Sequence, residues 1–122
     1  MNTTINTLEN ILEVKSLDNN IPSCSRYKEN LMGYILYAKE DKIIFPFVKN
    51  KVKLNVERIE LPYNTIGIIT CESSKKNIIL NNFANNLSID IYSKQLPYKI
   101  KKGDKVGMLY IIPTIECHVI KT

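Results

Sequence analysis

Apolar and polar residues alternate along several short segments, as in β-strands with one buried face and one solvated face. The apolar members of three such segments are Val52, Leu54 and Val56; Leu87, Ile89 and Ile91; and Ile115, Cys117 and Val119. The alternation assigns Asn55 to a solvated face, Cys117 to the core and His118 to the surface. Turn-forming residues separate the segments at intervals of roughly ten residues, which predicts an all-β sandwich or barrel.

The first residues are compatible with two structures. Asn6 and Glu9 have the spacing of a helix capping box, whereas Leu12 and Val14 alternate as in a strand. We expect a first strand near residues 13–17. A flexible tail of residues 1–10 precedes it, and residues 11–122 form a single β-domain.

Length and composition indicate an ordinary globular chain. The 122 residues suffice for one core, and 44% of them are hydrophobic and 24% charged. No apolar run is long enough to cross a membrane, and the N-terminus lacks the pattern of a leader peptide. Three cysteines, odd in number, are interpreted as reduced thiols. We therefore expect an intracellular protein without membrane contact, in the host cytoplasm or nucleus if it is viral.

The net charge of +5 comes almost entirely from lysine. Two lysine groups form a candidate basic patch: Lys49, Lys51 and Lys53 on one strand face, and Lys99, Lys101, Lys102 and Lys105 around a turn. Nucleic-acid binding is a weak candidate, because interleaved arginines and stacking aromatic residues are lacking. A solvated strand face is the favoured interpretation.

Three regions, in order, resemble motifs of the trimeric dUTPase family. Residues 33–38 resemble the first motif, residues 59–69 the approach to the second, and residues 100–109 the fourth, a glycine-aspartate turn before an apolar strand. The resemblance implies a single-domain, jelly-roll-like β-barrel or sandwich with little helix. It also implies a homotrimer in which residues 113–122 form a strand exchanged with a neighbour.

Five residues are interpreted as scaffold. Gly103 can supply positive φ for a turn, and Asp104 can accept hydrogen bonds from nearby backbone amides. Pro62 presets a turn, Gly67 permits a bulge or a close backbone approach, and Gly33 opens a strand in the first motif.

The resemblance also implies where a nucleotide would be bound and hydrolysed. The corresponding positions are Ile35, Glu72, Ser73, Leu80, Phe83 and Met108. Glu72 stands where the family has a phosphate-binding arginine, which replaces attraction by repulsion. Leu80 stands where the family has a water-activating aspartate, so the general base is missing. Only Ser73 keeps the family's residue.

These differences lead to the expectation of a chain that is not an enzyme. We expect a binding or regulatory module of viral or mobile-element origin, with an unknown protein partner, no cofactor, no metal site and no nucleotide binding. One alternative is a nucleotide-binding protein or hydrolase with a rebuilt pocket that uses Glu72, Ser73 and Asp90. A second alternative is a structural component of a viral particle.

Overall fold

The computed structural model describes residues 11–26, 33–71, 76–94, 96–115 and 117–121. These parts of the chain contain strands and no helix, as the sequence predicts. The strands are β1 (Glu13–Lys15), β2 (Cys24–Arg26), β3 (Gly33–Tyr37), β4 (Lys42–Ile44), β5 (Asn50–Lys53), β6 (Arg58–Glu60), β7 (Thr65–Thr70), β8 (Ile78–Leu80), β9 (Phe83–Asn85), β10 (Ser88–Ile91), β11 (Tyr98–Ile100) and β12 (Lys105–Pro113). The predicted tail of residues 1–10 lies outside the described residues, as do Glu72 and Ser73.

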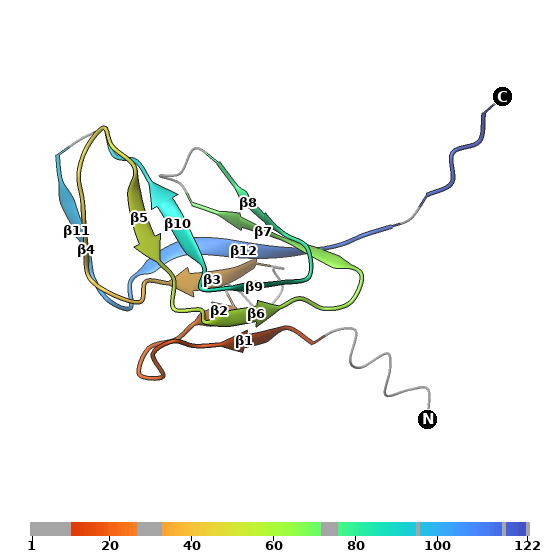
Figure 1. The fold of residues 1–122 in the computed structure, drawn as a ribbon, viewed down its shortest axis with the longest axis horizontal. Coiled ribbons are helices and arrows are strands. Elements are labelled where there is room, and N and C mark those ends of the chain that lie inside the picture. The colour runs from red at the N-terminus through yellow and green to blue at the C-terminus, as the bar shows by residue number, and fades with distance from the viewer. Residues whose placement is uncertain (1–10, 27–32, 72–75, 95, 116, 122) are drawn as a thin grey trace.

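The strands form two larger sheets and two ribbons, all built from antiparallel pairs. The five-stranded sheet has the order β2-β3-β12-β7-β8, and the three-stranded sheet has the order β1-β6-β9. The ribbons β4–β11 and β5–β10 lie together at one end of the molecule (Figure 1). The long strand β12 runs through the body and leaves it at the opposite end.

Side chains from both sheets and both ribbons share one hydrophobic core. Leu36 of β3, Ile59 of β6, Ile69 of β7 and Leu109 of β12 are fully or almost fully buried in it. On β5, Val52 is buried whereas the flanking lysines are exposed. The predicted alternation is therefore confirmed for this strand, and with it the all-β fold class.

Asn55 contradicts the predicted alternation. The sequence assigns it to a solvated face, but its side chain is completely buried. Its Oδ1 accepts a hydrogen bond from the Asp18 amide, and its Nδ2 donates to the carbonyls of Asp18, Ile21 and Pro22. The strand ends at Lys53, so the two-residue period no longer applies and the amide instead satisfies buried backbone groups.

The prediction that Cys117 lies in the core is wrong for its own chain, whereas the exchange of residues 113–122 with a neighbour stays a prediction. The expected core residue Cys117 is exposed, and the described residues after β12 form no strand within this chain. Thr114 is the last residue bonded to the body, through its amide and hydroxyl to the Asn64 carbonyl. The segment beyond it extends away from the body (Figure 1), so no core surrounds the thiol.

The predicted turn chemistry is present where β11 meets β12. Gly103 has φ 87°, and the Asp104 carboxylate accepts a hydrogen bond of 2.8 Å from the Lys101 amide. Gly67 lies in β7 without a bulge, and a Cβ there would lie 3.1 Å from the Leu109 side chain. The close backbone approach is therefore the correct alternative for Gly67.

The other two predicted scaffold residues lie at the ends of strands. The Pro62 carbonyl accepts a hydrogen bond from the Thr65 hydroxyl in the turn before β7. Gly33 is the buried first residue of β3 rather than part of a turn. No helix in the described residues is long and apolar enough to cross a membrane.

Candidate functional site

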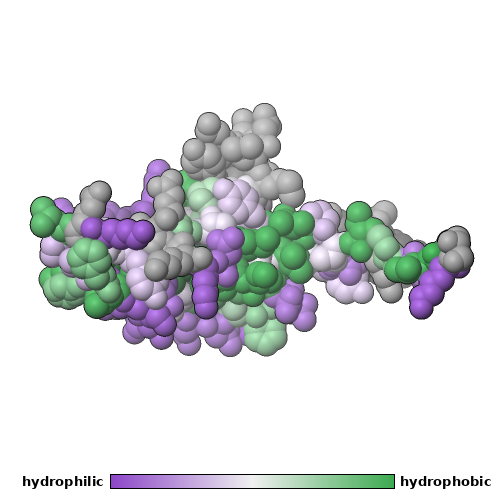
Figure 2. Space-filling model, turned by 90° about the horizontal axis from the view of Figure 1, so that it is seen from above, coloured by the Kyte–Doolittle hydropathy of each residue, from purple (hydrophilic) through white to green (hydrophobic). Residues whose placement is uncertain are grey.

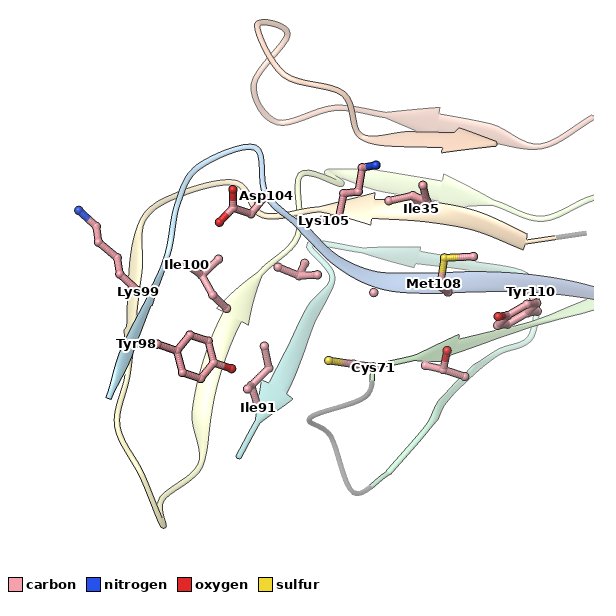
Figure 3. Close-up of a pocket in the computed structure, with 13 residues that line it drawn as sticks. Ile35, Cys71, Ile91, Tyr98, Lys99, Ile100, Asp104, Lys105, Met108 and Tyr110 are labelled. Carbon is pink, nitrogen blue, oxygen red and sulfur yellow. The ribbon is translucent and has the colours of Figure 1, made fainter. Parts of the chain in front are cut away.

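A cavity of about 610 Å³ opens between β11, the start of β12 and the ends of β7 and β10 (Figure 3). Its lining residues are Ile35, Thr70, Cys71, Ile91, Tyr98, Lys99, Ile100, Asp104, Lys105, Val106, Gly107, Met108 and Tyr110. The Tyr98 hydroxyl and the Cys71 sulphur point towards each other across this space. The cavity is large enough for a small organic ligand.

A β-bulge at the start of β12 shapes one wall of the cavity. The register between β12 and β3 shifts between Lys105 and Gly107, and bulges of this kind redirect side chains near functional sites. A Cβ on Gly107 would lie 3.1 Å from the Thr70 carbonyl oxygen. The missing side chain therefore lets β12 approach the end of β7 closely at the cavity wall.

Two lysines and one carboxylate line the cavity. The Lys99 side chain points away from the space in Figure 3, and its Nζ lies 3.3 Å from Asp41 Oδ2. The Asp104 carboxylate accepts a hydrogen bond from the Lys101 amide at Oδ2, so Oδ1 has no protein partner among the described residues. For Lys105 no ion pair is recorded among the described residues. The exposed Lys105 side chain lies at the rim of the cavity, with its ammonium on the Ile35 side of β12 (Figure 3), where it can attract an anion from the solvent.

The remaining walls combine apolar surface with a few polar groups. Ile35, Ile91 and Met108 provide apolar surface, while Thr70 and Tyr98 carry hydroxyls that can donate or accept hydrogen bonds. Such a lining suits a ligand with both a flat apolar part and an anionic part.

The structure divides the predicted nucleotide positions into two groups. Ile35 and Met108 line the cavity, together with Cys71, the residue before Glu72. Leu80 is buried in β8 and belongs to the core. Phe83 lies on β9 and does not line the cavity. Asp90 precedes a lining residue on β10, so its side chain points to the other face of the strand.

Phe83 belongs to a separate polar and aromatic group on the three-stranded sheet. Its ring is half exposed, and the guanidinium of Arg58 lies 4.3 Å from the ring centre. Glu60 accepts hydrogen bonds of 3.1 and 2.6 Å from Arg58, and Asn85 accepts one of 3.2 Å. The guanidinium is thus held over the ring by Glu60 on its own strand β6 and by Asn85 on the neighbouring strand β9.

The candidate basic patch is two distinct surfaces. Lys51 and Lys53 project from β5, whereas the second group surrounds the β11–β12 turn. Lys102 Nζ lies 2.5 Å from Asp18 Oδ2, and its amide donates to Asp41. The hydrogen bond with the Lys102 side chain is the largest of the contacts that lower the pKa of Asp18. The Lys102 amide, followed by the Lys99 side chain, lowers the pKa of Asp41. Part of the second group is therefore neutralised by nearby carboxylates.

The described residues contain no cluster of three or more His, Cys, Asp or Glu side chains that could hold a metal ion. Asp104 is the single carboxylate among the cavity-lining residues. These residues therefore do not fit a metal ion held by protein ligands alone. Burial raises the pKa of the Cys24 thiol to about 11, which keeps it protonated and unreactive at neutral pH.

Sequence reasoning missed several residues of the cavity. Thr70, Tyr98 and Tyr110 carry the hydroxyls of the lining, and they precede or flank motifs rather than belong to them. The positions of Tyr98 and Tyr110 on either side of the glycine-aspartate turn were the available signal. They become a site because β11 and β12 flank the same opening.

Comparisons with known proteins agree with this arrangement. No protein-family model matches the chain. A protein of Antonospora locustae named deoxyuridine 5'-triphosphate nucleotidohydrolase is 26% identical over 115 residues, which cover 86% of this chain and 80% of that protein. A variant dUTPase of the S. aureus phage phi11 has a TM-score of 0.75 at 19% identity, covering 93% of this chain and 97% of that one. The dUTPase of Staphylococcus bacteriophage 80alpha with dUpNHpp has a TM-score of 0.71 at 19% identity, covering 93% and 88%.

The chain has a dUTPase-like fold. The predicted family resemblance is thereby confirmed. The expectation that the chain is not an enzyme is contradicted, because the similar protein and the structural neighbours are named as dUTPases and point towards dUTP diphosphatase activity. The expectation that nucleotides do not bind is contradicted in the same way. The missing family residues at several positions do not exclude chemistry from other residues around the same opening.

Proposed function

We propose that this dUTPase-like chain binds and hydrolyses dUTP in the cavity between β11 and β12. The observation that carries the proposal is the position of the cavity. Ile35 of β3, Cys71 after β7 and Met108 of β12 meet there, and these are the places at which the resemblance puts the phosphate-binding motifs. The proposal corresponds to a nucleotide hydrolase with a rebuilt pocket.

The lining residues divide the work of binding. Lys105 supplies a positive charge for the phosphates, and the Thr70 and Tyr98 hydroxyls supply hydrogen bonds. Ile35 and Met108 supply apolar surface beside them, while Lys105 itself is exposed and attracts a phosphate oxygen from the solvent side. In the rebuilt pocket Lys105 alone thus takes the place of the charged residues that the family motifs would supply, and its surroundings are partly apolar.

Asp104 is the residue proposed to orient the attacking water. Its Oδ2 is fixed by the Lys101 amide, which leaves Oδ1 to accept a proton from water. The water oxygen bonds to the α-phosphorus of dUTP, and the bond from this phosphorus to the diphosphate leaving group breaks. The products dUMP and diphosphate are then released. Among the alternatives from the sequence, Asp90 does not line the cavity, and Glu72 lies outside the described residues.

The proposed site is completed by a neighbouring subunit. Phe83, which the resemblance gives for stacking on the sugar, lies outside the cavity of its own chain. We propose a homotrimer in which Phe83 of one subunit completes the cavity of the next. The C-terminal segment supports assembly, since Ile115, Val119 and Ile120 are each 85% exposed or more and extend away from the body. Three aliphatic side chains on one segment favour burial against a second copy.

Calorimetric titration with the imido analogue dUpNHpp tests the proposal. The wild-type chain should bind it, and Lys105→Ala should weaken binding by about tenfold through the loss of one charge-assisted contact. Lys53→Ala, on the exposed face of β5, is the matched control and should bind as the wild type does. Equal affinities for all three chains would place the nucleotide elsewhere, and absent binding would reject the proposal.

A further inference from the structure

Five exposed apolar side chains gather at the end of the molecule formed by β4 and β11. We call this group the apolar tip; its members are Ile43, Phe45, Phe47, Val48 and Leu96, with exposed fractions of 52%, 54%, 77%, 50% and 83%. Figure 2 shows hydrophobic side chains at this end of the molecule, opposite the C-terminal segment. Exposed apolar groups of this kind mark sites of interaction with proteins or membranes.

The backbone holds these side chains outward. Ile44 is fully buried, so its strand neighbours Ile43 and Phe45 project from the opposite face. The Phe47 amide donates a hydrogen bond of 2.7 Å to the Ser93 carbonyl, which joins the loop after β4 to the loop before β11. Phe47 has φ 64°, a left-handed conformation uncommon for an aromatic residue. The exposure of Phe47 is therefore fixed by the same contacts that join the two loops.

Positive charge surrounds the apolar tip. Residues 42–51 and 92–99 contain five lysines and no Asp or Glu: Lys42, Lys49, Lys51, Lys94 and Lys99. Asp41, just outside these ranges, pairs with Lys99, and Asp90 lies opposite Lys51 on the neighbouring strand β10, which leaves Lys42, Lys49 and Lys94. Two tips facing each other would bring like charges together, which disfavours a second copy of this chain as the occupant. The complementary surface is one that is both apolar and anionic.

We propose that the apolar tip docks onto the surface of a lipid bilayer that contains anionic lipids. The side chains lie at an end of the molecule and come from two loops, so they can enter the interface of a deformable bilayer without a matching cavity in a partner. Each lysine near an anionic bilayer strengthens binding by about fivefold. A surface contact requires no membrane-spanning segment, and the proposal does not depend on nucleotide hydrolysis.

Vesicle co-sedimentation of the full chain tests this inference. Vesicles contain phosphatidylcholine alone or with about one third phosphatidylserine, in buffer of low ionic strength, where exposed charges are least screened. The chain should sediment with the anionic vesicles and remain in solution with the neutral ones. Phe47→Asn combined with Leu96→Ser should weaken binding at least tenfold, since Asn tolerates the left-handed backbone and both changes remove apolar surface.

Two further variants distinguish vesicle binding through the apolar tip from non-specific adsorption. Ile79→Ser removes a side chain that is 64% exposed on β8 and should leave vesicle binding unchanged. Lys49→Glu with Lys94→Glu should abolish binding to the anionic vesicles. Circular dichroism verifies that each variant is folded. The proposal would be overturned if Ile79→Ser lost as much vesicle binding as the Phe47→Asn, Leu96→Ser variant. Equal sedimentation of the wild type with both kinds of vesicle would overturn it as well. A tip that serves an acidic protein partner instead would leave the chain in solution with both vesicles, which also overturns it.

Discussion

The side-chain amide of Asn55 and the backbone of Asp18 form a reciprocal pair of hydrogen bonds. Asn55 Oδ1 accepts from the Asp18 amide at 2.8 Å, and Asn55 Nδ2 donates to the Asp18 carbonyl at 2.9 Å. Nδ2 also donates to the carbonyls of Ile21 and Pro22. One buried side chain thus fixes the loop after β1 against the end of β5, and the same loop carries the Asp18 carboxylate to Lys102.

Replacement of Asn55 by alanine should lower the free energy of unfolding by about 3 kcal/mol, because several buried backbone groups lose their partner. Urea denaturation measures the change. Asn82→Ala is the matched control, since Asn82 is exposed, and it should shift stability by less than about 0.5 kcal/mol. Equal stabilities of the two variants would show that the Asn55 contacts are unimportant.

Asn55 also shows where sequence reasoning reached its limit. Alternation predicted the buried and exposed residues of β5, because a strand with one dry face imposes that period. It failed two residues beyond the strand, at Asn55, where backbone groups from a distant loop needed a partner. The Gly103–Asp104 turn was predictable because its geometry is local.

The cavity could be predicted only in part. Ile35 and Met108 were identified through motifs, but Tyr98 and Thr70 become neighbours of these residues only through the pairing of β12 with β3 and β7. Long-range pairing leaves no local signal in the sequence. The same holds for the apolar tip, whose two loops are 45 or more residues apart in the chain. The prediction that the chain lacks activity was based on differences from the family in each motif and did not include the other groups around the opening.

Acid should destabilise the chain through Asp18 and Asp41. Their contacts with Lys102 and Lys99 lower both pKa values in the folded state. The carboxylates therefore stabilise the fold above their unfolded pKa of about 3.9, and this stabilisation is lost as the pH falls through the lower, folded values. The urea midpoint of the wild type should decrease as the pH falls below about 4.

A chain with Asp18→Asn and Asp41→Asn should be less stable than the wild type at pH 7 and should lose less stability on acidification. Asp90→Asn is the control, since no ion pair is recorded for this carboxylate in the described part of the chain. Parallel acid curves for the wild type and the double variant would refute the assignment to these two carboxylates.

Two of the cysteines should react with a maleimide at different rates. Cys24 has a pKa of about 11 through burial and should remain unmodified until the chain unfolds. Cys71 lines the cavity, so dUpNHpp should slow its labelling severalfold. Peptide mass spectrometry follows each site. Labelling of Cys71 at the same rate with and without the nucleotide would argue against binding in the cavity.

Removal of the residues after Thr114 should convert the proposed homotrimer into monomers. The body ends at the Thr114–Asn64 hydrogen bonds, so the shortened chain keeps its core. Light scattering should give about 42 kDa for the full chain, three times 14.1 kDa, and about one third of that for the truncated one. A full chain of monomeric mass at micromolar concentration would refute the trimer.

Release of diphosphate from dUTP by the purified full chain tests the central claim most directly. The account predicts turnover of dUTP above that of dTTP and dCTP. It also predicts a rate at least about tenfold lower in Lys105→Ala and in Asp104→Asn, in line with the loss of one binding or proton-accepting group, and an unchanged rate in Lys53→Ala. A rate for the wild type no greater than that of buffer with each nucleotide would contradict the proposed hydrolysis. Equal rates in the wild type and in both cavity variants would contradict the proposed site.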